Sequence, residues 1–178
     1  MMPADLRAHR ETARYLSLCS YLPTQSTMYI NCHSYYSLRY GMMSVEQLVQ
    51  NAVRAGADVI AMTDINNSTG IPEFAGECNK NNIRPVAGIE FRKGNELLYT
   101  GIARNNEGLR ELNEFLSRHN CEKSDLPFPA PRFSNAYTIY PSGRIPPGKP
   151  AENERIAISP SALSRLITIQ GSCDRNSM

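Results

Sequence analysis

The sequence predicts an α/β fold in which helices cover a parallel sheet. The main observation is a regular order of strand and helix patterns, which forms two units of about 30 residues each over residues 29–90. The second observation is the apolar character of the predicted strands, since residues 59–62 form a continuous apolar run of strand length. Strands that are apolar on both faces are typical of parallel sheets with helices outside.

The first strand is expected over residues 29–34. Alternation there places Asn31 and His33 on one face of the strand. Residues 1–27, which precede it, carry no sustained hydrophobic period, and Met28 is a second credible start. We therefore expect residues 1–27 to be a poorly ordered N-terminal extension.

Two helices are expected after this strand. The first follows Ser44, a favourable N-cap with Gln47 at the third helical position, and Gly56 ends it. The second begins near Pro72, because proline is tolerated in the first turn, and runs to Asn82. The strands of this region lie before, between and after the helices, at residues 29–34, 59–62 and 84–90.

The α/β order continues to residue 120 and then gives way to proline-rich segments. Residues 96–103 form a strand pattern, and residues 105–119 form an amphipathic helix pattern. The segments 126–131 and 141–150 are rich in proline, which disfavours helix. Beyond residue 120 we expect strands at residues 136–140 and 155–158, a helix over residues 160–166 and an irregular tail over residues 167–178.

Composition narrows the classes of protein to which the chain can belong. Its 178 residues, 41% of them hydrophobic, have room for one domain or for part of a larger one. The net charge of +2 does not demand a nucleic-acid partner, although a small basic groove needs only a few well-placed residues. The five scattered cysteines form no CxxC pair, which fits reduced thiols in a cytoplasmic protein. No apolar run approaches membrane-spanning length.

Polar side chains stand at the ends of successive predicted strands. Asn31 and His33 end the first strand, Asp64 follows the second, and Glu90 ends the third. The carboxyl ends of parallel strands meet at one edge, where α/β folds collect their chemistry. An imidazole with two carboxylates can hold a divalent metal such as Zn or Mn, which would activate water to hydrolyse a phosphate ester. The same residues also suit structural roles, with His33 as a hydrogen-bonded histidine and Asp64 as an acceptor in a loop.

Several segments, in order, resemble the polymerase and histidinol phosphatase (PHP) domain family, in the form found at the N-terminus of the bacterial DNA polymerase III alpha subunit. The resemblance rests on YINCHSYYSLRYG, SVEQLVQNAVRAGADVIAMTDINN, GIPEFAGECNKNNIRPVAGIEF and LLYTGIARNNEGLRELNEFLSRHN. It covers about residues 28–166 and implies a partial (βα)7 barrel, truncated at its C-terminus. In active members the resemblance implies a metal cluster that hydrolyses phosphoesters or acts as a 3′–5′ exonuclease.

The resemblance implies a set of metal-ligand positions, and this chain has a suitable ligand at only some of them. His33 matches the second histidine of the family's first motif, and Asp64 and Glu90 match an aspartate and a glutamate of later motifs. Asn31 and Ile65 replace family histidines, so the implied site is reduced to one metal on His33, Asp64 and Glu90. No catalytic residue is assigned, and no organic cofactor is expected.

The first functional prediction is therefore a structural and interaction module. It would be the N-terminal PHP-domain portion of a DNA polymerase III alpha-subunit-like replicative polymerase, with a degenerate metal site and no polymerase active site of its own. Its partners would be the rest of the polymerase and proofreading or replisome subunits, with DNA reached through the parent enzyme and no membrane. The alternative is a metal-dependent phosphoesterase or 3′–5′ exonuclease that uses the residual metal site.

Overall fold

A computed structural model describes residues 27–148 and 150–158. Of the extension predicted over residues 1–27, residues 1–26 lie outside the described residues, whereas Thr27 is the first residue of a strand. The helix expected over residues 160–166 and the tail expected over residues 167–178 also lie outside the described residues. The described elements are β1 (Thr27–Cys32), α2 (Val45–Arg54), β2 (Ala57–Met62), α3 (Ile71–Lys80), β3 (Arg84–Lys93), β4 (Glu96–Ala103), α4 (Asn106–Glu122), β5 (Ala136–Pro141) and β6 (Glu154–Ala157).

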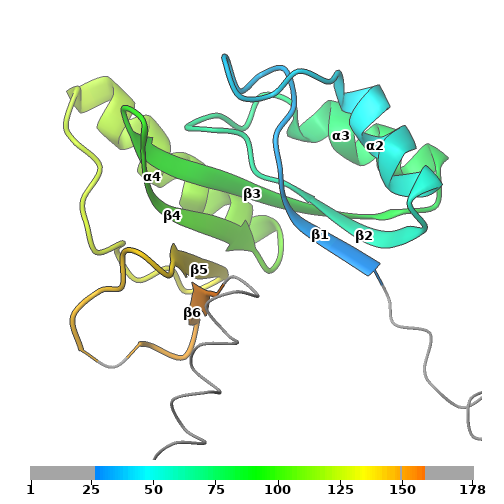
Figure 1. Cartoon of the computed structure of the whole chain (residues 1–178). Coiled ribbons are helices and arrows are strands. Elements are labelled where there is room, and N and C mark those ends of the chain that lie inside the picture. The colour runs from blue at the N-terminus through cyan, green and yellow to red at the C-terminus, as the bar shows by residue number, and fades with distance from the viewer. Residues whose placement is uncertain (1–26, 149, 159–178) are drawn as a thin grey trace, which may run out of the picture.

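The strands form one curled six-stranded sheet in the order β1-β2-β3-β4-β5-β6 (Figure 1). The pairs β1–β2, β2–β3 and β5–β6 are parallel, whereas β3–β4 and β4–β5 are antiparallel. The α/β class is confirmed, but the prediction of parallel strands throughout is wrong. The sheet is consistent with a partial PHP barrel, while the seven-unit count and the truncation stay predictions.

A tight turn explains why the sheet changes direction after β3. Gly94 and Asn95 are the only residues between β3 and β4, and Gly94 has a φ of 60°, a conformation that glycine adopts without strain. A parallel pair needs a long crossover connection, whereas two residues suffice for a hairpin. β3 and β4 must therefore be antiparallel.

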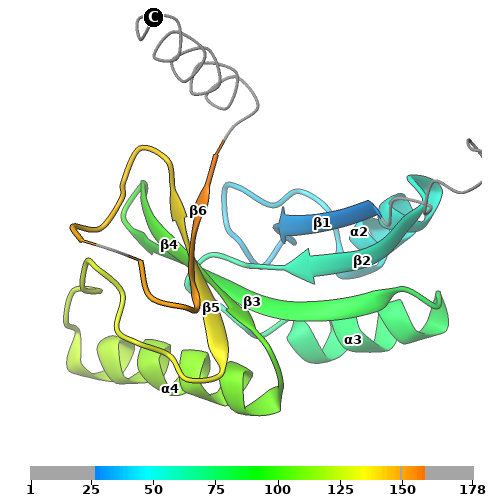
Figure 2. The same cartoon turned by 90° about the horizontal axis from the view of Figure 1, so that it is seen from below.

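The helices form where the sequence provides caps and apolar faces. Ser44 and Gln47 form the predicted capping box of α2, and Asn105 caps α4 by accepting a hydrogen bond from the N–H of Gly108. α2 and α3 pack on β2 and β3 around buried Phe74. α4 packs on β3, β4 and β5, and Figure 2 shows α3 and α4 on the same side of the long β3. The described residues contain no helix long and apolar enough to cross a membrane.

β3 is longer than expected, and this extension positions the candidate site. The sequence pattern predicts that the strand ends at Glu90, but β3 continues to Lys93. Glu90 therefore lies inside a strand rather than at its end. Because side chains alternate along a strand, Arg92 lies on the same face as Glu90.

Candidate functional site

Glu90 is the centre of a buried polar cluster. Its side chain is 0% exposed, and its Oε2 lies 3.2 Å from Nε2 of His33. The Nδ2 amide of Asn31 donates to the same oxygen at 3.2 Å. The other carboxylate oxygen, Oε1, accepts a hydrogen bond from Nε of Arg92. Both oxygens of this carboxylate are thus engaged by donors of the chain itself.

The side chain of Asn31 is oriented by a second contact. The hydroxyl of Thr63 donates to Oδ1 of Asn31 at 2.6 Å. An ionised carboxylate only accepts hydrogen bonds, so the amide group of Asn31 must present its NH2 side to Glu90. Asn31 therefore acts as a donor to Glu90, with its oxygen directed to Thr63.

Arg92 is held beside Glu90 by contacts on other sides. Its guanidinium lies over the ring of Tyr40, with Cζ 4.4 Å from the ring centroid. Its Nη1 also donates to the backbone carbonyl of Asn95 at 3.2 Å. The side chain is 14% exposed, so the charge that faces Glu90 is largely shielded from water. Such a pair depends strongly on each partner, because either charge alone would be buried without compensation.

The pKa of Glu90 reflects this competition between burial and donors. Burial alone raises the pKa of the carboxyl group, because it penalises the charged form. Hydrogen bonds and positive charge from His33 and Arg92 more than offset that effect, and the pKa lies below its ordinary value of 4.5. Glu90 is therefore ionised at neutral pH.

This lowered pKa predicts how stability depends on pH. A folded-state pKa below the unfolded value stabilises the protein above about pH 4.5, and that contribution is lost as the pH falls through the folded-state pKa. We expect the wild type to lose stability below pH 4.5 more steeply than Glu90→Gln, which cannot titrate there. Urea denaturation from about pH 3 to about pH 7 measures the slope of the free energy of unfolding against pH for both proteins. Parallel slopes would show that Glu90 carries no lowered pKa.

Asp64 belongs to a different network. Its side chain is 1% exposed, and Oδ1 accepts from the backbone N–H of Ser34 at 2.7 Å and from the hydroxyl of Ser37 at 2.6 Å. Oδ2 accepts from the hydroxyl of Ser34 at 2.6 Å. Asp64 thus orders the loop between β1 and α2. Gly41 completes this loop, because a Cβ there would lie 1.7 Å from the carbonyl oxygen of Ser34.

The backbone nevertheless brings Asp64 close to Glu90 in the sheet. The chain after β2 forms a parallel bridge between Ile65 and Glu90, in which the N–H of Glu90 donates to the carbonyl of Asp64 at 3.1 Å. The strand-end prediction therefore brings the expected residues to one region of the sheet. Side-chain hydrogen bonds join His33 to Glu90, whereas those of Asp64 go to Ser34 and Ser37.

These residues do not fit a metal ion. Both oxygens of Glu90 are taken, Asn31 presents a donor, and Ile65 offers no ligand atom. Within residues 27–148 and 150–158, no group of three or more His, Cys, Asp or Glu side chains could hold a metal. The arrangement can neutralise and bury a carboxylate, but it presents no open coordination position.

Sequence reasoning missed several members of the two networks. Arg92 was not predicted, although its position two residues after Glu90 would have indicated it if the strand had been extended. Ser34, Ser37 and Thr63 also carry hydrogen bonds of the site. No pattern marks these three residues, because their partners are 27 to 32 residues away in the chain.

Comparison with known proteins gives both a family and a fold. A sequence profile described as "PHP domain" matches residues 30–145. A DNA polymerase III subunit alpha of Staphylococcus aureus is 35% identical over 92 residues, which cover 50% of this chain and 9% of that protein. The corresponding protein of Ureaplasma parvum is 32% identical over 88 residues, which cover 49% of this chain and 9% of that protein. The matches thus span about a tenth of the length of these relatives.

A solved structure has a similar fold. It is a Bifidobacterium adolescentis protein described as a metal-dependent phosphoesterase, with a TM-score of 0.51 and 12% identity over 85% of each chain. At this identity the likeness concerns the arrangement of the backbone alone. The profile match at residues 30–145 lies inside the range 28–166 expected from the sequence motifs, and the exact boundaries of that range stay a prediction.

Proposed function

Since the chain belongs to the PHP domain family, we propose that it is the N-terminal PHP-domain portion of a DNA polymerase III alpha-subunit-like replicative polymerase. The identity of 35% to a DNA polymerase III subunit alpha supports this assignment over half of the chain. The proposed role is that of a structural and interaction module in the cytoplasmic replication machinery. Its partners are the remainder of the polymerase and its proofreading or replisome subunits, and it reaches DNA through the parent enzyme.

The observation that carries the non-catalytic role is the pairing of Glu90 with Arg92. In a metal centre, a divalent cation would neutralise this carboxylate, whereas here a guanidinium does so. Two unit charges about 4 Å apart repel by about 4 kcal/mol at the effective dielectric constant of protein sites. A divalent ion beside Arg92 would face about twice that cost. The pairing of Arg92 with Glu90 therefore favours a site in which a side chain takes the place of a metal.

The loop between β1 and α2 is the proposed contact surface with the polymerase. Leu38 is 83% exposed and Met42 is 94% exposed, and both lie in this one loop. Tyr35 and Tyr40 add half-exposed aromatic rings to the same loop. The network of Asp64 fixes one end of this loop, so the apolar side chains are displayed on an ordered support. Such side chains are typical anchors of protein interfaces.

The experiment for this role measures binding to the remainder of the polymerase, a DNA polymerase III alpha subunit of the same organism from which the N-terminal PHP domain has been removed. We expect the wild-type chain to bind and the double variant Leu38→Ser, Met42→Ser to bind at least about tenfold more weakly, since each loses buried apolar area in the complex. Biolayer interferometry measures both affinities. Val53→Ser, at an exposed position on α2, is the matched control and should bind like the wild type. Equal binding by the loop variant and the wild type, or no binding by either, would contradict the module.

The alternative is a metal-dependent phosphoesterase or 3′–5′ exonuclease that uses His33, Asp64 and Glu90. The observation in its favour is the distance of 3.2 Å between His33 and Glu90, which keeps two of the expected ligands together. It requires Arg92 to leave the carboxylate and Asp64 to leave both serines. Because it demands both rearrangements, we rank it second.

A further inference from the structure

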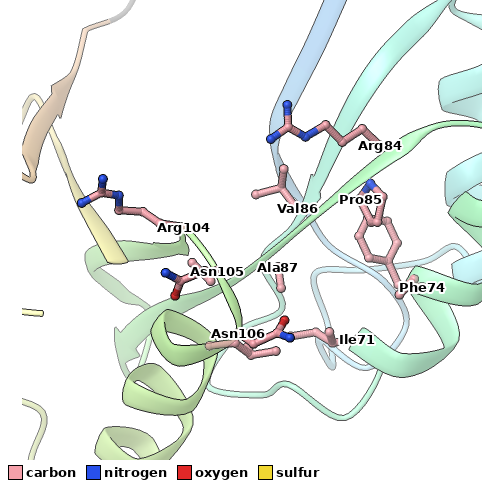
Figure 3. Close-up of a pocket in the computed structure, with 12 residues that line it drawn as sticks. Ile71, Phe74, Arg84, Pro85, Val86, Ala87, Arg104, Asn105 and Asn106 are labelled. Carbon is pink, nitrogen blue, oxygen red and sulfur yellow. The ribbon is translucent and has the colours of Figure 1, made fainter. Parts of the chain in front are cut away.

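A second candidate site lies away from Glu90, on the side of the sheet that carries α3 and α4. A cavity of about 260 Å³ opens between these helices over the start of β3 (Figure 3). A second cavity of about 410 Å³ lies beside it, between β5 and the segment that leads into β6. Arg104, which follows β4, lines both cavities. Arg84 lies six residues before Glu90, about 20 Å along the strand.

Four arginines line these two cavities and define what we call the arginine surface: Arg84, Arg104, Arg132 and Arg155. The lining contains one carboxylate, that of Glu152. Within the described part of the chain, none of the four arginines forms an ion pair, whereas Arg92, Arg110 and Arg144 each pair with a glutamate. The arginine surface is therefore a local excess of positive charge on a chain whose total charge is only +2. Such an excess attracts anions.

Two of these arginines are held in place by one tyrosine. Cζ of Arg104 lies 5.3 Å from the ring centroid of Tyr137, and Cζ of Arg155 lies 5.5 Å from it. Nη1 of Arg155 also donates to the backbone carbonyls of Glu152 and Glu154. A guanidinium stacked on a ring keeps the N–H groups at its edge available, and they match the oxygens of a phosphate. Tyr137 thus holds two groups whose chemistry suits phosphate in one place.

The first cavity differs from the second because its floor is apolar. We call the apolar part of its lining the floor, which includes Phe74, Val86 and Leu109. The exposed residues Arg84 and Asn106 also line this cavity. Figure 3 shows the side chain of Arg104 directed away from Arg84, so the two charges flank the opening instead of sharing one point. An apolar floor with exposed amide and guanidinium groups in the same lining suits a planar base whose phosphate stays outside.

From these contacts we propose that the arginine surface binds single-stranded nucleic acid. The first cavity receives a base, and Arg104 and Arg155 hold neighbouring phosphates of the backbone. A duplex is excluded from this arrangement because its stacked bases cannot enter a cavity. A single free phosphate would use one arginine pair and leave the apolar floor empty. The proposal does not depend on the interaction role assigned above to Leu38 and Met42.

The test is fluorescence anisotropy with a labelled single-stranded oligothymidylate of about 12 nucleotides, at salt concentrations from about 50 to 200 mM. We expect the double variant Arg104→Ala, Arg155→Ala to bind at least about tenfold more weakly than the wild type. Its plot of log affinity against log salt should be shallower by about 1.4, since each phosphate contact contributes about 0.7 for single strands. The matched control is Arg54→Ala, Arg118→Ala, which removes equal charge at exposed positions outside both cavities and should bind like the wild type.

Four outcomes would overturn the proposal. They are absence of binding by the wild-type chain, equal weakening in the control variant, equal affinity for the same sequence as a duplex, and full displacement by inorganic phosphate at an equal phosphate concentration. The second outcome would indicate attraction by net charge alone, and the fourth would indicate a simple anion site. None of these outcomes would change binding to the polymerase through Leu38 and Met42. Failure of the nucleic-acid proposal is therefore distinguishable from failure of the proposed interaction role.

Discussion

Replacing Arg92 with alanine is expected to lower the free energy of unfolding by about 3 to 5 kcal/mol at neutral pH. The reason is that Glu90, 0% exposed, would keep its negative charge in the interior without its guanidinium partner. His33 and Asn31 would remain, but neither supplies the permanent charge of an arginine. Urea denaturation followed by circular dichroism measures the loss.

The pKa of Glu90 also predicts how the stability of Arg92→Ala depends on pH. Burial raises that pKa, and Arg92 is one of the two residues whose hydrogen bonds and charge lower it. In Arg92→Ala the pKa should rise, so part of the lost stability should return as the solution is acidified and the carboxyl group becomes neutral. The wild type, in contrast, should lose stability as the solution is acidified, because its lowered pKa stabilises the fold only while Glu90 is ionised.

Two further variants separate the pair from a general effect of the substitution. Arg92→Ala in a Glu90→Gln background should cost at least about 1.5 kcal/mol less than in the wild type, because no buried charge is left unpaired. Arg118→Ala removes an exposed arginine of α4 and should change stability by no more than about 0.5 kcal/mol. If Arg92→Ala were as mild as Arg118→Ala, Arg92 would not be the charge that neutralises Glu90.

Asp64→Ala is expected to be the second most damaging substitution, with a loss of about 3 kcal/mol. Three donors from Ser34 and Ser37 would lose their acceptor, and each unsatisfied buried donor costs about 1 kcal/mol or more. Thermal denaturation monitors the fold. Proteolysis of the loop between β1 and α2 monitors its local opening, which should become faster in the variant.

Serine variants provide the control for Asp64. Ser37→Ala removes one donor, and its cost should be well below that of Asp64→Ala. The double variant Asp64→Ala, Ser37→Ala should cost less than the sum of the two, because the hydroxyl left without an acceptor is also gone. Additive losses would show that Asp64 does not act through these serines.

Much of the backbone could be predicted from local sequence. The capping box at Ser44, the apolar run before Asp64 and the amphipathic pattern of α4 all agree with the elements found. The hairpin at Gly94 was missed because the predicted strand ends at Glu90, which leaves residues 91–95 between the two predicted strands and hides the tight turn. Gly94, which lies between the two strand patterns, was the available signal for a turn.

The candidate site could be predicted in part. The expectation that His33 and Glu90 lie close together agrees with the structure, in which Nε2 of His33 lies 3.2 Å from Oε2 of Glu90, although β2 separates β1 from β3 in the sheet. The strand pattern could not assign the hydrogen bonds of Asp64, which depend on how the loop with Ser34 and Ser37 folds back. The arginine surface was also hidden, since Arg84, Arg104, Arg132 and Arg155 are at least 20 residues apart and only the sheet brings them together.

The central claim is that a guanidinium occupies the electrostatic place of a metal beside Glu90. Its most direct test is the metal content of the purified wild-type chain after incubation with Zn²⁺ and with Mn²⁺, measured by inductively coupled plasma mass spectrometry beside His33→Ala. The claim predicts far less than one metal per chain in both proteins and no difference between them. About one metal per wild-type chain that is lost in His33→Ala would contradict it.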